Sequence, residues 1–170
     1  RQVYNYIKSA TGQGAIIVGN DEVTIGGTTG KPLTIGSADA AQALSFVATG
    51  SVVNGQKSYN LKSATGAVMQ AGDGTLLLVE GATGSPFTFS KRDNEGNAFD
   101  IHSGDYYYYL NGDGQLAKEK EITSDVAADF EALSAYLFTV DDALEDYQNN
   151  AAADEKTGLD LGWEFNDATE

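Results

Sequence analysis

The strongest constraint on the fold is a short segment that occurs twice. Residues 4–12 read YNYIKSATG and residues 58–66 read SYNLKSATG, so that KSATG recurs at an offset of 54 positions. A segment that recurs in phase is typical of a chain built from similar structural units. Residues 107–114, YYYLNGDG, are a weaker third match, which places Leu110 where the second copy has Leu61. The sequence therefore predicts three related copies.

A second set of similar segments follows these three. Each segment has a bulky apolar residue two positions before a phenylalanine, and this spacing puts both side chains on one face of a strand. The segments are QALSFVA at 42–48, SPFTFSK at 85–91 and SAYLFTV at 134–140, with the pairs Leu44 and Phe46, Phe87 and Phe89, and Tyr136 and Phe138.

Each copy has room for two more strands between these markers. Gly-rich segments such as SATG and NGDG join the strands, and Gly supplies the positive φ angles of tight hairpins. Four short strands in each of three copies give twelve, which is the strand number of a β-trefoil. We therefore expect an all-β chain, a β-trefoil over residues 1–142 with copies at about 3–54, 55–104 and 105–142. Short helical turns are expected at SADAAQA and SDVAADFEALSA.

The last part of the chain differs in composition. Residues 143–170 are acidic and Ala-rich, and LDLGWEF near their end alternates like one more strand. We expect an extension that packs on the trefoil through Trp163 and Phe165, or one that is partly mobile. The net charge is −15, and 15 of the 25 acidic residues lie from Lys118 onward.

This charge disfavours nucleic acid and anionic membrane surfaces as partners, because both are bound through clustered Lys and Arg. No apolar run is long enough to span a membrane. The chain has no Cys, so disulfides, thiolate metal sites and cysteine nucleophiles are excluded, while the redox compartment stays open.

The motif Y-x-[IL]-K-S-A-T-G and the pattern [LFY]-x-F resemble the ricin-B-type lectin trefoils, in particular the divergent forms on surface and secreted proteins of gut bacteria. The resemblance covers about residues 3–142. It implies a non-catalytic, cofactor-free carbohydrate-binding module of an extracellular or cell-surface bacterial protein, whose signal segment is absent from this sequence. Leu44 stands where that family has the Trp of Q-x-W, and no copy has the family's complete sugar-binding set of Asp, aromatic platform and Asn or Gln.

The tyrosines are the main candidates for ligand binding. If Leu110 points to the core, strand alternation turns Tyr108 inward and Tyr107 and Tyr109 outward. In the first copy the outward pair is then Tyr4 and Tyr6. Outward aromatic rings on a rigid sheet can stack on the apolar face of a sugar, and the hydroxyl adds a hydrogen-bonding group. The alternative is that these rings pack under a neighbouring loop or the extension.

Three polar residues in turns are further candidates for sugar contacts. Asn111 and Asp113 lie in NGDG, and Asp73 lies in AGDG. Asn, Asp and Gly are also the residues that tight turns require, so a purely structural role is the alternative. None of these turns has the ligand spacing of an EF-hand, and we expect no metal site.

Catalytic residues are few. His102 is the single histidine, and its surroundings FDIHSGD contain no nucleophile elbow or oxyanion loop, so we expect no enzymatic activity in this chain itself. The chain is also compatible with an accessory domain of a larger enzyme. The alternative function is a protein-interaction module, either a spacer domain of a larger surface protein or a protease inhibitor that uses residues 26–33, with Lys31 before Pro32, as its exposed loop.

Overall fold

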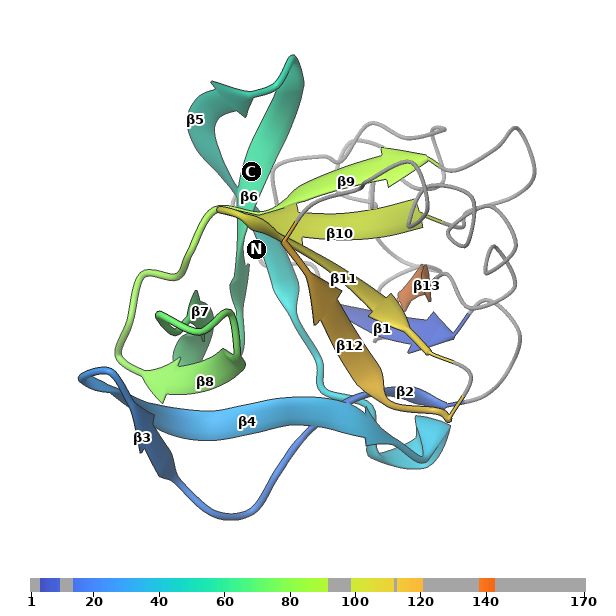
Figure 1. Cartoon of the computed structure of the whole chain (residues 1–170). Helices are drawn as coiled ribbons and strands as arrows, with labels where there is room; N and C mark the ends of the chain where they lie inside the picture. The colour runs from blue at the N-terminus through green and yellow to red at the C-terminus, as the bar shows by residue number, and fades with distance from the viewer. Residues whose placement is uncertain (1–3, 10–13, 92–98, 112, 121–137, 143–170) are drawn as a thin grey trace.

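The structure is a computed structural model that describes residues 4–9, 14–91, 99–111, 113–120 and 138–142. In these residues the chain is all-β (Figure 1). The strands are β1 (Asn5–Ser9), β2 (Ala15–Val18), β3 (Val23–Ile25), β4 (Thr28–Gly36), β5 (Ser45–Val53), β6 (Gln56–Lys62), β7 (Gly66–Gln70), β8 (Leu76–Glu80), β9 (Thr88–Lys91), β10 (Phe99–Ser103), β11 (Tyr106–Leu110), β12 (Leu116–Glu119) and β13 (Phe138–Asp142).

All strand pairings among the described residues are antiparallel, and the sheet curls. From β1 the pairing runs to β13, then to β10 and then to β9. A bridge between Tyr59 and Phe87 connects the start of β9 to β6, which pairs with β5. A second bridge, between Asn5 and Leu44, leads from the start of β5 back to β1. The pairings thus return to the strand from which they started.

Three hairpins extend from this curled sheet: β2 with β4, β7 with β8, and β11 with β12. The register that leads into each hairpin is the same, because Lys8 pairs with Ala15, Lys62 with Ala67 and His102 with Tyr107. β10 is therefore the counterpart of β1 and β6, and β11 the counterpart of β2 and β7.

This register differs from the sequence prediction, which matched the tyrosine run to the first strand of a copy and Leu110 to Leu61. The pairing puts Ile101 of β10 in that position instead. The two choices look alike in sequence because both strands alternate and both precede a Gly-containing turn. Only the pairing with the neighbouring strand distinguishes the two assignments. Neighbouring strands have the same alternation of period two, so the sequence pattern cannot show that the match is shifted by one strand.

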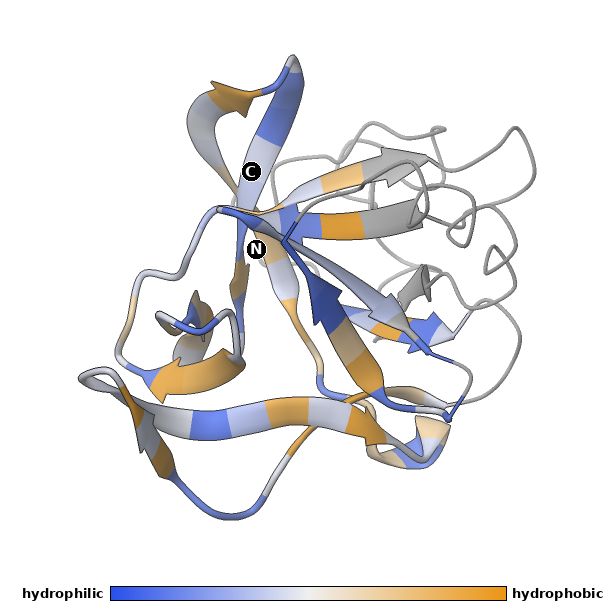
Figure 2. Cartoon of the chain, in the orientation of Figure 1, coloured by the Kyte–Doolittle hydropathy of each residue, from blue (hydrophilic) through white to orange (hydrophobic). Residues whose placement is uncertain are grey.

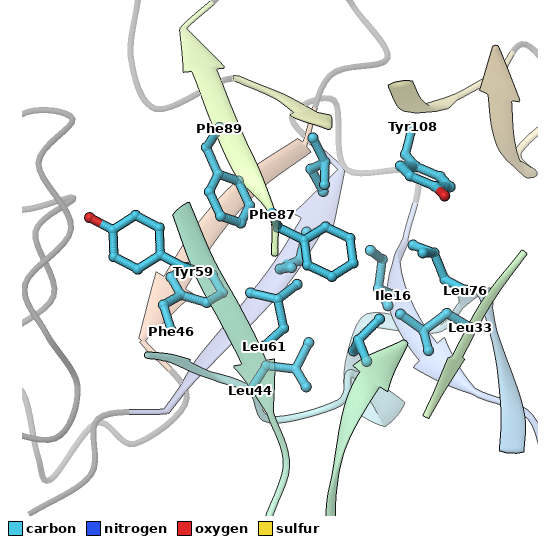
Figure 3. Packing of buried hydrophobic residues seen from close by; sticks show 13 residues of the cluster. Ile16, Leu33, Leu44, Phe46, Tyr59, Leu61, Leu76, Phe87, Phe89 and Tyr108 are labelled. Carbon is cyan, nitrogen blue, oxygen red and sulfur yellow. The ribbon is translucent and has the colours of Figure 1, made fainter. Parts of the chain in front are cut away.

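The core lies inside the curled sheet, where strands contribute alternate residues. Hydrophobic residues alternate with more polar ones along part of β4 (Figure 2). The predicted pairs Leu44 and Phe46, and Phe87 and Phe89, are all buried, which confirms the i, i+2 spacing in the first two copies. The rings of Phe46 and Phe89 are 5.2 Å apart (Figure 3). Burying a phenylalanine side chain stabilises the fold by about 1.5–3 kcal/mol, so these rings are major contributors to stability.

One of the two predicted helical turns is present as the 3-10 turn η1 (Ala38–Ala40). The Ser37 hydroxyl accepts a hydrogen bond from the Asp39 amide at its start, which is the usual capping interaction. The turn predicted at SDVAADFEALSA and the extension 143–170 lie outside the described residues.

No helix in the described part of the chain is both long and apolar enough to span a membrane.

Candidate functional site

The tyrosine run of β11 has two faces with different surroundings. Tyr108 is buried, with 2% of its surface exposed, as the alternation predicts. Tyr106 is on the same side and packs against the core. Tyr107 and Tyr109 project to the other side and are half-buried. The run thus contributes both to packing and to the surface.

The inner face is attached to the turn between β7 and β8. The Tyr108 hydroxyl donates a hydrogen bond to the Gly74 carbonyl and accepts one from Gln70 Nε2 at 2.7 Å. Gln70 Nε2 also donates to the Ser103 carbonyl at 2.6 Å. Burial raises the pKa of Tyr108 to about 12 because the phenolate would be poorly solvated there. These hydrogen bonds join the β7–β8 hairpin to the β11–β12 hairpin.

A lysine reinforces the same junction. Lys118 Nζ donates to the Asp73 carbonyl at 2.6 Å and lies 3.8 Å from its carboxylate. The carboxylate accepts a hydrogen bond from the Thr75 amide at 2.9 Å, and this bond lowers the pKa of Asp73, with a smaller contribution from Lys118. The ammonium groups of Lys118 and Lys120 each lie 5.7 Å from the Tyr106 ring centre, which gives two cation–π contacts. The carbonyl and carboxylate of Asp73 therefore both take part in the contact between the β7–β8 and β11–β12 hairpins.

The outer face gathers polar and aromatic side chains from three strands. In the ladder, Tyr107 stands between His102 of β10 and Glu119 of β12. The His102 and Tyr107 rings are 4.3 Å apart at 42°, and the Tyr109 hydroxyl donates to the Glu119 carboxylate at 3.4 Å. We call His102, Tyr107, Tyr109 and Glu119 the outer tyrosine face.

His102 gives this face a neutral polar group. Partial burial lowers the pKa of His102, and the opposing effects of the Asp105 charge and the Gly104 backbone are smaller. Its Nδ1 lies 3.5 Å from Thr88 Oγ1. A neutral imidazole has one donor and one acceptor nitrogen, so the face offers two phenol rings, an imidazole and a carboxylate.

The face offers aromatic rings for stacking and polar groups for hydrogen bonds. Among the described residues, its Tyr109 hydroxyl and Glu119 carboxylate form a hydrogen bond of 3.4 Å, which orients the phenol. In the same residues no group of three or more His, Asp or Glu could hold a metal ion.

The other sequence candidates lie elsewhere. Tyr4 and Tyr6 are half-buried beside and on β1, where the Lys8 ammonium lies 5.5 Å from the Tyr6 ring. Asn111 Oδ1 accepts hydrogen bonds from the Asp113 and Gln115 amides at 3.0 and 2.9 Å, which is the turn role given above as the alternative. The structure therefore brings together Tyr107 and Tyr109 and separates them from Asp73, which belongs to the opposite face.

Sequence reasoning left out His102 and Glu119 as members of the site. A signal was available for the first, because the two residues between Ser103 and Tyr106 are Gly and Asp, which favour a tight hairpin. Such a hairpin places His102 opposite Tyr107. Glu119 needed the register of β12 as well.

Only Gly26 and Gly27 of the proposed inhibitor segment 26–33 form an exposed turn, and the rest of the segment belongs to β4. Lys31 and Pro32 lie inside β4, where they pair with Leu78 and Leu77 of β8. A protease-binding loop has to present an accessible backbone, and this one is already paired in a sheet.

No family model, curated protein or solved structure matches the chain.

Proposed function

We propose that the chain is a non-catalytic carbohydrate-binding module, with a β-trefoil fold, of a secreted or cell-surface bacterial protein. The fold proposal is supported by the pairings that return to β1 and by the three hairpins with equal register. In this arrangement the third copy begins at β10 rather than at residue 105. The resemblance of the repeated motifs to ricin-B-type lectins supports the same fold.

The observation that carries the function is the outer tyrosine face. Tyr107 and Tyr109 stand on one side of a strand whose backbone is paired on both edges. The Tyr107 ring packs on the His102 ring, and the Tyr109 hydroxyl bonds to the Glu119 carboxylate. The C–H face of a sugar ring packs on such aromatic surfaces, and the Glu119 carboxylate and His102 imidazole bond to hydroxyl groups. A pre-formed surface binds without the cost of ordering its side chains.

Charge favours uncharged sugars as the ligand. The Glu119 carboxylate is part of the face, Asp105 acts on His102, and the whole chain carries −15. Two like charges about 4 Å apart near a protein surface repel by about 4 kcal/mol. We therefore expect neutral polysaccharides to bind better than those that carry uronate or sulfate groups.

A glycan array followed by calorimetric titration tests this proposal. We expect the protein to bind at least one neutral polysaccharide, and Tyr107→Ala to weaken binding at least about tenfold, which is 1.4 kcal/mol. Tyr107→Phe keeps the ring and should retain most of the affinity. Tyr6→Ala removes an aromatic ring of the first copy and serves as the matched control. Unchanged affinity of Tyr107→Ala, or no binding to any glycan, would show that the proposal is wrong.

A further inference from the structure

The three hairpins share one register, so each contains a row of three neighbouring residues at the same place. In each row the first residue lies on the strand that enters the hairpin and the other two lie on the hairpin itself. The rows are Lys8, Ala15 and Gly36 in the first, Lys62, Ala67 and Val79 in the second, and His102, Tyr107 and Glu119 in the third. The third row alone has an aromatic residue and a carboxylate.

In the first two rows the central position is closed. Ala15 and Ala67 are both fully buried. In the second hairpin, Gly84 lies over Ala67: a Cβ added to this glycine would be 3.2 Å from the alanine methyl group. The Ser85 amide next to it donates to the Val68 carbonyl at 2.9 Å.

The first hairpin is covered in the same way. The Gln42 amide, on the connection from β4 to β5, donates to the Ile16 carbonyl at 3.0 Å. Both connections are short: eight positions separate Gly36 from Leu44, and eight separate Val79 from Phe87. A larger side chain at Ala67 would meet the segment at Gly84, and Ala15 is completely buried.

The third hairpin differs in the burial of its central residue and in the length of the connection that follows it. Its central residue, Tyr107, is half-exposed and carries a hydroxyl in place of a buried methyl group. The corresponding separation in sequence, from Glu119 to Phe138, is nineteen positions rather than eight. Phe138 pairs with Phe99 as Leu44 pairs with Asn5 and Phe87 with Tyr59. It therefore corresponds to Leu44 and Phe87, and not to Phe46 and Phe89 as the sequence pattern predicts.

We propose that, of the three described hairpins, only the third binds a glycan, through the outer tyrosine face, and that the other two have a structural role alone. This inference rests on the proposed function. It means that one chain binds monovalently, and that any avidity comes from neighbouring domains or from several chains on one surface rather than from the internal repeats.

Two exchanges between the rows test it. Tyr107→Ala gives the third row the residue of the other two, and Ala67→Tyr gives the second row the residue of the third. We expect Ala67→Tyr to lower the melting temperature by about 5 °C or more, because the tyrosine has to displace the segment at Gly84. Tyr107→Ala should lower it by less than about 3 °C, because its ring is only partly buried.

Calorimetric titration with a glycan selected on the array gives the second readout. We expect one glycan per chain, and in Tyr107→Ala a uniform loss of affinity of at least about tenfold. A stoichiometry of two or three, a fraction of sites in Tyr107→Ala that keeps the wild-type affinity, or an unchanged melting temperature of Ala67→Tyr would overturn the single site while leaving the proposed function intact. Absence of glycan binding by the wild-type protein would overturn the proposed function itself, and the two melting temperatures would still decide whether the third hairpin alone is open.

Discussion

Removal of one oxygen atom from Tyr108 is expected to weaken the junction between the second and third hairpins. In Tyr108→Phe the ring stays in the core, and the lost hydroxyl is the group that donates to the Gly74 carbonyl and accepts from Gln70. Gln70 keeps its bond to the Ser103 carbonyl, so its amide remains satisfied. The carbonyl of the buried Gly74 loses its partner.

Leaving one buried polar group unpaired costs about 1–3 kcal/mol. We therefore expect the free energy of unfolding to fall by about 2 kcal/mol, which lowers the melting temperature of a chain of this size by about 4–8 °C. Urea unfolding gives the free energy directly, and the slope m should not change because the ring remains in place.

Tyr106→Phe is the matched control. Tyr106 lies two positions away on the same face and is half-buried, and no hydrogen bond of its hydroxyl is present among the described residues. Its loss should change the free energy by less than about 0.5 kcal/mol. If both variants unfold at the same urea concentration, the hydrogen bonds of Tyr108 do not hold the hairpins together, and the reasoning is refuted.

Three further predictions concern stability. Because burial raises the pKa of Tyr108 from 10.0 to about 12, its neutral form stabilises the fold fully below pH 10, and this stabilisation is lost as the pH rises from 10 to 12. Urea unfolding across that range should show a smaller loss of unfolding free energy in Tyr108→Phe than in the wild-type protein. Gly74→Ala should destabilise the fold by more than about 1 kcal/mol, because Gly74 has φ +89° and an added Cβ would lie 2.7 Å from the Tyr106 ring. In urea unfolding, the control Gly72→Ala in the same turn should cost less than about 1 kcal/mol, because its Cβ would meet no atom within 4 Å. Phe87→Ala should cost about 3–5 kcal/mol by calorimetry because Phe87 is fully buried, and Val52→Ala, at a position 65% exposed, should stay within about 0.5 kcal/mol.

Much of the local structure could be predicted from the sequence. The spacing of Phe87 and Phe89 predicts a strand with one buried face, and both residues are buried. Alternation along the tyrosine run predicts that Tyr108 is inside and its neighbours outside, which the structure confirms. These predictions succeed because side-chain direction in a strand has a period of two, so it depends on the residue's own position and not on the partner strand.

The composition of the candidate site depended on pairing. His102 and Glu119 are five and twelve positions from Tyr107, and only the registers of β10 with β11 and of β11 with β12 bring the three together. The same registers make β10 the counterpart of β1 and β6. A sequence pattern specifies which residues face the same side of one strand, but not which residue of another strand stands beside them.

Local periodicity is enough to predict the strands, the repeated segments, and the buried and outward sides of the tyrosine run. The tertiary structure decided what the two sides do. It joined the inner side to Gly74 and Gln70, and it placed the outer side in a row with His102 and Glu119. It also buried Ala15 and Ala67 at the equivalent positions. Whether a small side chain is buried depends on which connection between strands packs beside it, and the alternation along a strand does not specify this.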